Sequence, residues 1–286
     1  MTAQIIDGAA LAKQKLIELK QIVTELIVRG IHPGLATVQV GDDAASRIYV
    51  RNKVRACIAA GVSSVHHDLP GSSSEGDVLQ LLHQLNHDPK VHGIIVQLPV
   101  PRHLDARRLS QAIAVTKDVD GFNWQNLGAL VEGAPGMLPC TPRATMVLLD
   151  SAKIPLEGRH AVVVGRSNIV GKPVALLLIG RGATVTVCNS RTPELAAVTR
   201  QADILVVATG KAGLITRAMV KPGVAVIDVG INRLTSGKIV GDVAFDEVTE
   251  IAGWITPVPG GVGPMTVAML VENTVNAAAR VALNQQ

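Results

Sequence analysis

Hydrophobic residues recur along the chain in short runs that alternate with longer amphipathic segments. In the first half, β-rich runs at 34–41, 62–70 and 92–99 each end at glycine or proline, which predicts three strands. Between them, segments 43–61 and 75–88 begin with an acidic residue and end at or just before glycine or proline, a pattern typical of helices.

The second half repeats this rhythm, with apolar runs separated by helix-sized segments. The predicted strands there are 160–165, 183–188, 203–210 and 224–230. Strands that alternate with helices form βαβ units, so the strands of each half are expected to be parallel.

We therefore predict an α/β fold with two lobes, an N-terminal α/β lobe and a Rossmann-like lobe with a parallel sheet. Paired prolines in 139–155 precede a helix that we expect to bridge them. Pro264 suits the first turn of a last helix, 264–283, which is expected to return to the first lobe. The predicted domains are residues 1–142 with 265–286, and residues 143–264.

Composition narrows the class of protein. Apolar residues make up 48% of the 286 residues and charged residues 17%, which is the composition of a compact chain rather than a disordered one. The longest apolar runs are too short to cross a bilayer, so no membrane association is expected. The N-terminal segment lacks the pattern of an export signal, which predicts a cytoplasmic protein.

Nucleic-acid and metal binding are not expected. The net charge is +4, but the basic residues are dispersed, and two tryptophans, one tyrosine and two phenylalanines offer little surface for base stacking. The eight histidines and three cysteines show no metal-binding spacing, so we predict no metal and no disulfide. A phosphorylated or carboxylated small ligand explains the positive charge better.

A candidate phosphate-binding turn follows the first strand of the second lobe. The segment 160-HAVVVGRSNIVGKP-173 runs from an apolar strand through Gly165, Arg166 and Ser167 to a helix that opens near Gly171. Such a turn presents backbone N–H groups and a helix N-terminus to a nucleotide phosphate. It departs from GxGxxG, and an ordinary strand–turn–helix connection would show the same pattern.

The end of the next strand indicates which nucleotide is bound. NAD enzymes normally carry Asp or Glu there for the ribose hydroxyls, whereas this strand ends 187-VCNSRT-192. Ser190 and Arg191 could instead hold a 2′-phosphate by hydrogen bonds and charge, with Arg166 as a second cation. NADP is therefore the predicted cofactor, although Arg191 could also be only a solvated residue at a strand end.

Three polar residues of the first lobe are candidates for chemistry. Tyr49 and Lys53 lie four residues apart in a predicted helix and so share a face. Gln97 lies near the C-terminal edge of an apolar strand, where parallel sheets bind ligands, and is a candidate partner of Lys53. An amphipathic helix with a half-buried tyrosine and a solvated lysine would look the same. The segment 117-KDVDGF-122 by itself predicts only a turn.

At these residues the sequence resembles the bifunctional methylenetetrahydrofolate dehydrogenase/methenyltetrahydrofolate cyclohydrolases, the FolD family. The resemblance spans nearly the whole chain and occurs in family order. It rests on 49-YVRNKVRACIAAGV-62, 93-GIIVQLPVP-101, 117-KDVDGF-122, 139-PCTP-142, 163-VVGRSNIVGKP-173, 227-IDVGINR-233 and 256-TPVPGGVGPMT-266. Two departures stand out: the chain reads 120-DGFNWQNLGAL-130 where many members read DGFHPxNxGRL, and Asn189 replaces a common histidine.

The resemblance implies roles for particular residues. Lys53 would be the catalytic lysine, Gln97 its partner, Asp120 the anchor of the pterin, and Tyr49 the ring stacked on the folate. The implied cofactor contacts are Gly165, Arg166, Ser167, Ser190 and Ile231, to which the strand-end argument adds Arg191. The expected folate site also includes Leu98 and the loop Pro259, Gly260 and Gly261.

These roles agree with the chemistry that the resemblance implies. Residues 1–142 with 265–286 would form the folate-binding catalytic domain of a homodimer, and 143–264 the NADP-binding domain. Tetrahydrofolate derivatives would be the substrates. Hydride transfer mainly needs orientation, whereas hydrolysis needs a group that takes a proton from water, as an amine can. Two alternatives remain at this stage: a two-lobed NADP dehydrogenase resembling shikimate dehydrogenase, and a non-catalytic NADP-sensing module.

Overall fold

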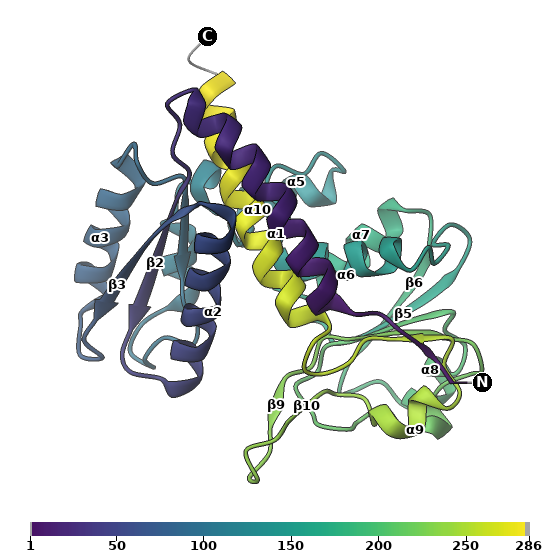
Figure 1. The fold of residues 1–286 in the computed structure, drawn as a ribbon. Coiled ribbons are helices and arrows are strands. Elements are labelled where there is room, and N and C mark those ends of the chain that lie inside the picture. The colour runs from purple at the N-terminus through teal and green to yellow at the C-terminus, as the bar shows by residue number, and fades with distance from the viewer. Residues whose placement is uncertain (1, 284–286) are drawn as a thin grey trace. The chain divides into compact units, whose positions relative to one another are not determined.

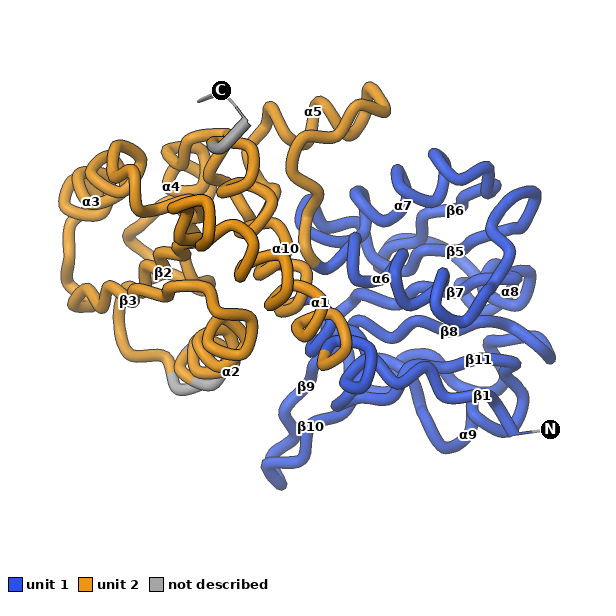
Figure 2. Tube along the Cα trace, turned by 45° about the horizontal axis from the view of Figure 1, so that its top comes forward, with its two compact units in different colours: residues 1–12, 141–266 blue, residues 13–140, 267–286 orange. Residues whose placement is uncertain are grey.

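The computed structural model describes residues 2–283 of the chain, without the side chains of residues 44–46, 48, 282 and 283. The chain divides into two compact units, coloured separately in Figure 2. Unit 1 contains residues 1–12 and 141–266, and unit 2 contains residues 13–140 and 267–286. The expected domains differ mainly in residues 1–12, which the sequence analysis groups with the first lobe.

Unit 2 is built on a parallel sheet of three strands within its described residues, in the order β3-β2-β4. Its strands are β2 (Gly34–Val40), β3 (Ser63–Leu69) and β4 (Gly93–Val96). Its helices are α1 (Gly8–Val28), α2 (Ala44–Ala60), α3 (Glu75–His87), α4 (Ala106–Gln111), the 3-10 helix η1 (Val115–Lys117), α5 (Trp124–Val131) and α10 (Val262–Leu283). Helices α1 and α10 begin in unit 1 and continue into unit 2.

The sheet of unit 2 explains the apolar runs of the first half. Every residue of β2 and β4 is buried, as expected for parallel strands covered on both faces. One face packs against α3 and α4 through Val78, Leu82 and Leu109. Helices α1 and α10 run side by side (Figure 1), and Lys15 of α1 forms an ion pair with Glu272 of α10 at 3.7 Å.

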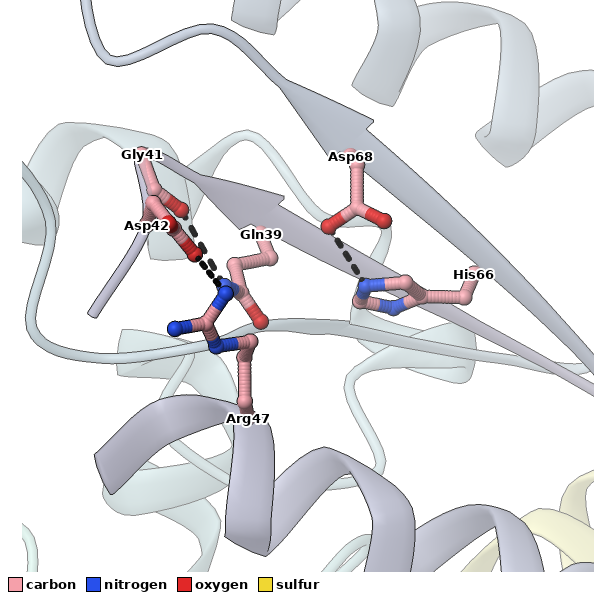
Figure 3. Close-up of polar contacts among 6 residues, drawn as sticks. All are labelled: Gln39, Gly41, Asp42, Arg47, His66 and Asp68. Carbon is pink, nitrogen blue, oxygen red and sulfur yellow. Dashed lines mark hydrogen bonds and ion pairs between the residues drawn. The ribbon is translucent and has the colours of Figure 1, made fainter. Parts of the chain in front are cut away.

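Strand β3 lies at one edge of this sheet, and its residues are exposed or half-buried. Its polar side chains pair locally: His66 Nε2 lies 2.8 Å from Asp68 Oδ1 (Figure 3). At the end of β2, Gln39 Nε2 donates to the carbonyl of Gly41 at 3.1 Å. Strand β3 therefore carries more exposed polar side chains than β2 or β4.

Unit 1 contains a sheet of six parallel strands among its described residues, in the order β1-β11-β8-β7-β5-β6. These strands are β1 (Gln4–Ile5), β5 (His160–Val164), β6 (Thr184–Cys188), β7 (Ile204–Val207), β8 (Ala225–Asp228) and β11 (Trp254–Ile255). The other elements are α6 (Cys140–Ser151), α7 (Gly171–Gly180), α8 (Leu195–Thr199), η2 (Arg217–Met219), α9 (Phe245–Thr249) and the hairpin of β9 (Asn232–Arg233) and β10 (Ile239–Val240).

Strand β1 explains why the first residues belong to unit 1. Gln4 and Ile5 pair in parallel with Trp254 and Ile255 of β11, and so extend the sheet at its edge. The central strands β7 and β8 are fully buried and pack against partly buried side chains from α8, η2 and α9. No helix among residues 2–283 has the length and apolar character needed to cross a membrane.

Candidate functional site

The structure brings Lys53 and Gln97 together in unit 2. Lys53 projects from α2, is half-buried, and donates from Nζ to Gln97 Oε1 at 2.9 Å. Gln97 follows β4, and its backbone N–H donates to Val38 of β2 at 2.8 Å, which continues the sheet. Its side-chain Nε2 donates to the carbonyl of Leu98 at 2.7 Å. Because the amide nitrogen is engaged there, the amide oxygen is directed toward Lys53.

Asp120 is the third polar group at this place. Burial raises the pKa of the Asp120 carboxyl, the positive charge of Lys53 opposes this rise, and the charge of Asp118 adds to it. The influence of the Lys53 charge on Asp120 indicates that the two groups belong to one electrostatic site. The amine of Lys53 and the amide of Gln97 therefore meet beside the end of β4, within electrostatic range of the Asp120 carboxyl.

The two acids of the 117–122 segment have different functions. Asp118 is 1% exposed and accepts from the backbone N–H of Asn123 at 2.7 Å and from Asn126 Nδ2 at 2.9 Å. Asn123 caps α5, its Oδ1 accepting from the N–H of Gln125 at 3.0 Å. Asp118 thus holds the turn and the start of α5, while Asp120 contributes to the polar site.

Further contacts fix this turn, and one of them comes from a residue that the sequence analysis did not identify. Asn273 of α10 donates from Nδ2 to the carbonyls of Val119 at 2.8 Å and Leu138 at 3.0 Å. Lys117 donates from Nζ to two carbonyls at the end of α3, and burial lowers the pKa of its amine. In the sequence, Asn273 is marked only as a polar residue within the largely apolar segment 264–283.

Tyr49 lies one helical turn before Lys53 on α2, as the spacing predicted. Its side chain is 36% exposed, and burial of the remainder raises the pKa of the phenol. Part of the Tyr49 side chain is therefore accessible from solvent. Leu98 is half-buried and takes part through its carbonyl, which accepts from Gln97.

In unit 1, the turn after β5 has the backbone of a nucleotide-binding turn. Gly165 adopts φ 128°, and a Cβ there would lie 2.2 Å from the carbonyl oxygen of Ala208, so only glycine fits. Gly171, the first residue of α7, would likewise place a Cβ 2.1 Å from the oxygen of Gly165. Ser167 Oγ accepts from the N–H groups of Val170 and Gly171 at 3.1 and 3.3 Å. Arg166 is exposed beside this turn.

The turn after β6 presents Ser190 and Arg191 to solvent. Asn189 forms this turn: its Oδ1 accepts from the N–H of Arg191 at 3.0 Å, and its own N–H donates to Thr192 Oγ1 at 2.9 Å. No acidic side chain occurs between β6 and Thr192, so hydroxyl and guanidinium donors replace the usual carboxylate. Both turns therefore fit a dinucleotide at the carboxyl edge of the sheet.

Ile231 and the loop of Pro259, Gly260 and Gly261 also lie in unit 1. Ile231 is 46% exposed, and its Cδ1 lies 3.7 Å from where a Cβ of Gly263 would be. The carbonyl of Gly260 accepts from the N–H of Ala9 at 2.8 Å, which ties the loop to the start of α1. Among the residues that the structure describes, no group of three or more His, Cys, Asp or Glu side chains could hold a metal ion.

Comparison with protein families gives two matches that together cover most of the chain. The catalytic domain of tetrahydrofolate dehydrogenase/cyclohydrolase matches residues 6–120. The NAD(P)-binding domain of the same enzymes matches residues 139–282.

Individual relatives match over almost their full length. The bifunctional protein FolD of Moorella thermoacetica is 58% identical over 280 residues, 98% of this chain and 100% of that protein. The crystal structure of the bifunctional FolD enzyme from Campylobacter jejuni has a TM-score of 0.96 at 49% identity, covering 98% of this chain and 99% of that one. The Trypanosoma brucei FolD, complexed with NADP cofactor and inhibitor, has a TM-score of 0.95 at 40% identity, covering 99% of each chain.

Shikimate dehydrogenase, the alternative raised by the two-lobed pattern, is much less similar. The enzyme of Aquifex aeolicus matches at 13% identity with a TM-score of 0.51, covering 87% of this chain and 97% of that one. That is a likeness of fold alone. The full-length matches instead establish that this chain belongs to the tetrahydrofolate dehydrogenase/cyclohydrolase family.

Proposed function

We propose that this chain oxidises 5,10-methylenetetrahydrofolate to 5,10-methenyltetrahydrofolate with NADP and then hydrolyses the product to 10-formyltetrahydrofolate. The observation that carries the proposal is the Lys53–Gln97 hydrogen bond beside Asp120, in a chain whose full-length relatives are bifunctional enzymes. One amine, one amide and one carboxylate suit a site that binds folate and moves a proton.

In the oxidation, the protein mainly orients the folate. NADP⁺ supplies the hydride acceptor when bound. The resulting methenyl cation is stabilised by its two flanking nitrogens, so no base is needed for this step. Tyr49 offers a half-open ring for stacking on the folate. Asp120 accepts N–H groups of the pterin through its carboxylate oxygens.

In the hydrolysis, Lys53 acts on the attacking water. The water oxygen bonds to the methenyl carbon and loses a proton to the neutral amine of Lys53. The hydroxyl oxygen of this adduct then becomes the formyl carbonyl and gives up its remaining proton as the bond from the carbon to the ring nitrogen breaks, and that nitrogen takes up a proton. A cationic substrate disfavours a second positive charge beside it, which favours the neutral amine. Gln97 holds this amine without adding the negative charge of a carboxylate.

NADP rather than NAD is the proposed cofactor. Ser190 and Arg191, exposed on the turn after β6, would hold the 2′-phosphate, with Arg166 as a second cation. The complex of the Trypanosoma brucei relative with NADP supports this choice. Gly165, Ser167 and Ile231 would contact the rest of the cofactor, and Pro259 to Gly261 would border the folate.

We also propose a homodimer that works in the cytoplasm. Strand β3 has a neighbour on one side only among the described strands, so its other edge can pair with a second copy of the chain. Cys57, Cys140 and Cys188 are buried and none forms a disulfide, which suits a reducing compartment. Light scattering of the purified chain tests the dimer, and a mass of one chain contradicts it.

Substitution of Lys53 by methionine tests the two-step proposal. Methionine retains much of the apolar stem and removes the amine, so we expect cyclohydrolase activity to fall by about a hundredfold to ten-thousandfold. Some dehydrogenase activity should survive, so the decisive quantity is the ratio of the two rates. Formation and decay of the methenyl product are measured separately.

Lys20→Met is the matched control, because Lys20 is an exposed lysine on α1 of the same unit. It should leave both rates unchanged. An equal decline of both activities in a folded Lys53→Met variant would make Lys53 a shared binding residue. Absence of turnover of methylenetetrahydrofolate by the unmutated chain would overturn the proposed function itself.

A further inference from the structure

Asp228 ends the central strand β8 of unit 1 and is 3% exposed. Its Oδ1 accepts from the N–H groups of Gly230 at 2.9 Å and Asp242 at 3.0 Å, and its Oδ2 accepts from the N–H of Val243 at 3.0 Å. A Cβ on Gly241 would lie 1.8 Å from Oδ2, so glycine is needed where the carboxylate meets this segment. One buried carboxylate therefore joins the turn after β8 to the segment after β10.

Asp242 continues this network and is fully buried. Its Oδ2 accepts from the N–H of Thr209 at 2.5 Å, from Thr209 Oγ1 at 2.9 Å and from the N–H of Gly210 at 2.9 Å. Its Oδ1 accepts from Asn232 Nδ2 at 2.8 Å. The second carboxylate thus holds the loop after β7 and the start of the β9–β10 hairpin.

The two acids fix the residues on both sides of Ile231. Gly230 is held by Asp228 through its backbone, and Asn232 is held by Asp242 through its side chain. Ile231 itself remains 46% exposed. A residue whose neighbours are both anchored to buried carboxylates presents its backbone and side chain in one position.

The network also extends to the nucleotide-binding turn. The loop after β7 contains Ala208, whose N–H donates to the carbonyl of Val164 at 2.8 Å. The carbonyl oxygen of Ala208 would lie 2.2 Å from a Cβ at Gly165, so the two backbones pack closely. Strands β5, β7 and β8 are neighbours in the sheet (Figure 2), so these loops share its carboxyl edge. Ligands of open parallel sheets bind at that edge.

This arrangement is electrostatically costly. Burial and the neighbouring Asp242 charge raise the pKa of Asp228 to about 6, against the hydrogen bonds from three N–H groups. Groups with such perturbed environments gather at functional sites more often than at purely structural ones.

We propose that Asp228 and Asp242 are positioning residues for the dinucleotide, acting through the loop after β7 and through Ile231. The inference rests on the proposed binding of NADP by unit 1. Neither acid is assigned to contact the cofactor. Instead, each acid positions a backbone segment, the loop after β7 or the residues around Ile231, that would contact the cofactor.

The test compares Asp228→Asn and Asp242→Asn with Asp203→Asn. Asp203 is the matched control, because it accepts from the N–H of His160 and from Lys221 Nζ at the opposite, amino edge of the same sheet. An asparagine keeps the shape but replaces one acceptor oxygen with a donor, which opposes the N–H groups around it. NADP affinity is measured directly by calorimetry, together with melting temperature and hydrolysis of methenyltetrahydrofolate.

We expect the two edge variants to bind NADP about tenfold more weakly or worse, as for loss of one charge-assisted hydrogen bond. Asp203→Asn should lower the melting temperature without changing NADP affinity. Hydrolysis does not consume NADP and should persist in all three variants. If either acid variant fails to fold, Asn232→Ala removes a single donor to Asp242 and should weaken NADP binding on its own.

Unchanged NADP affinity in the folded Asp228→Asn and Asp242→Asn variants overturns the inference and leaves the acids as structural. An equal loss of affinity in Asp203→Asn does so too. If the unmutated chain fails to bind NADP, the proposed cofactor is wrong, and that outcome is separate from the first two.

Discussion

Replacing Asp228 by asparagine should change how the stability of unit 1 depends on pH. Burial raises the pKa of Asp228 to about 6 from an ordinary value of 3.8, so the folded chain binds this proton more tightly than the unfolded chain. Above pH 6 the folded state carries a buried charge. As the pH falls from about 6 to about 4, protonation removes that charge in the folded state first, and the contribution of Asp228 to stability rises.

The size of the effect follows from the shift. The pKa of Asp228 differs by about two units between the folded and unfolded states, which corresponds to ~3 kcal/mol of unfolding free energy. Of this, ~1.4 kcal/mol is gained between pH 8 and pH 5. Asparagine also leaves at least one of the three N–H groups without an acceptor, which costs ~1–3 kcal/mol. That loss is independent of pH, so it does not enter the difference between the two pH values.

Urea unfolding at pH 8 and pH 5 measures this difference. The chain has two tryptophans, Trp124 in unit 2 and Trp254 in unit 1, so a Trp124→Phe background makes fluorescence report on unit 1. In that background, the unfolding free energies of the protein that retains Asp228 and of the Asp228→Asn variant are compared at each pH. The difference between them, in favour of the protein that retains Asp228, should increase by ~1.4 kcal/mol from pH 8 to pH 5. A difference that stays constant, or that shrinks toward pH 5, refutes the reasoning about the buried charge.

Three further substitutions address the two sites. Arg191→Ala should raise the Michaelis constant for NADP by about tenfold while that for NAD stays the same, as initial rates with each cofactor would show; equal use of both cofactors by the unmutated chain contradicts this. Asp120→Ala should lower kcat/KM for oxidation and for hydrolysis, each by about tenfold or more, because one anchor serves both steps; normal values in both assays would reduce Asp120 to a turn residue. Gly165→Ala places a methyl 2.2 Å from the oxygen of Ala208, so NADP binding measured by calorimetry should be lost while hydrolysis persists.

The sequence predicted the parts of the fold in which local pattern and tertiary role agree. The runs at 34–41 and 160–165 contain β2 and β5, because strands buried in a parallel sheet are mostly apolar. The sequence pattern assigns no element to residues 4–28, although they form β1 and α1. Strand β1 is two residues long and exists only through its pairing with β11, and such a segment has no periodicity to detect.

The candidate site shows a similar limit. Helical spacing and the position after a strand correctly suggested that Lys53 and Gln97 meet, and the 2.9 Å contact confirms it. The segment 117–122 contains two aspartates, and nothing in the local sequence distinguishes Asp118, which holds the turn, from Asp120, whose pKa responds to the charge of Lys53. That distinction depends on Asn126 and on Lys53, which come from other parts of the chain.

The discontinuity of the two units has a consequence for biosynthesis. Unit 2 is completed by α10, whose residues Met269, Leu270 and Val271 are among its most deeply buried side chains. Strands β2, β3 and β4 emerge from the ribosome well before this helix. The apolar surface that α10 covers in the folded protein is therefore exposed until α10 has been synthesised. Intermediates of this kind are prone to aggregate and to recruit chaperones. The rate at which the last part of the chain is translated should therefore influence the yield of folded protein.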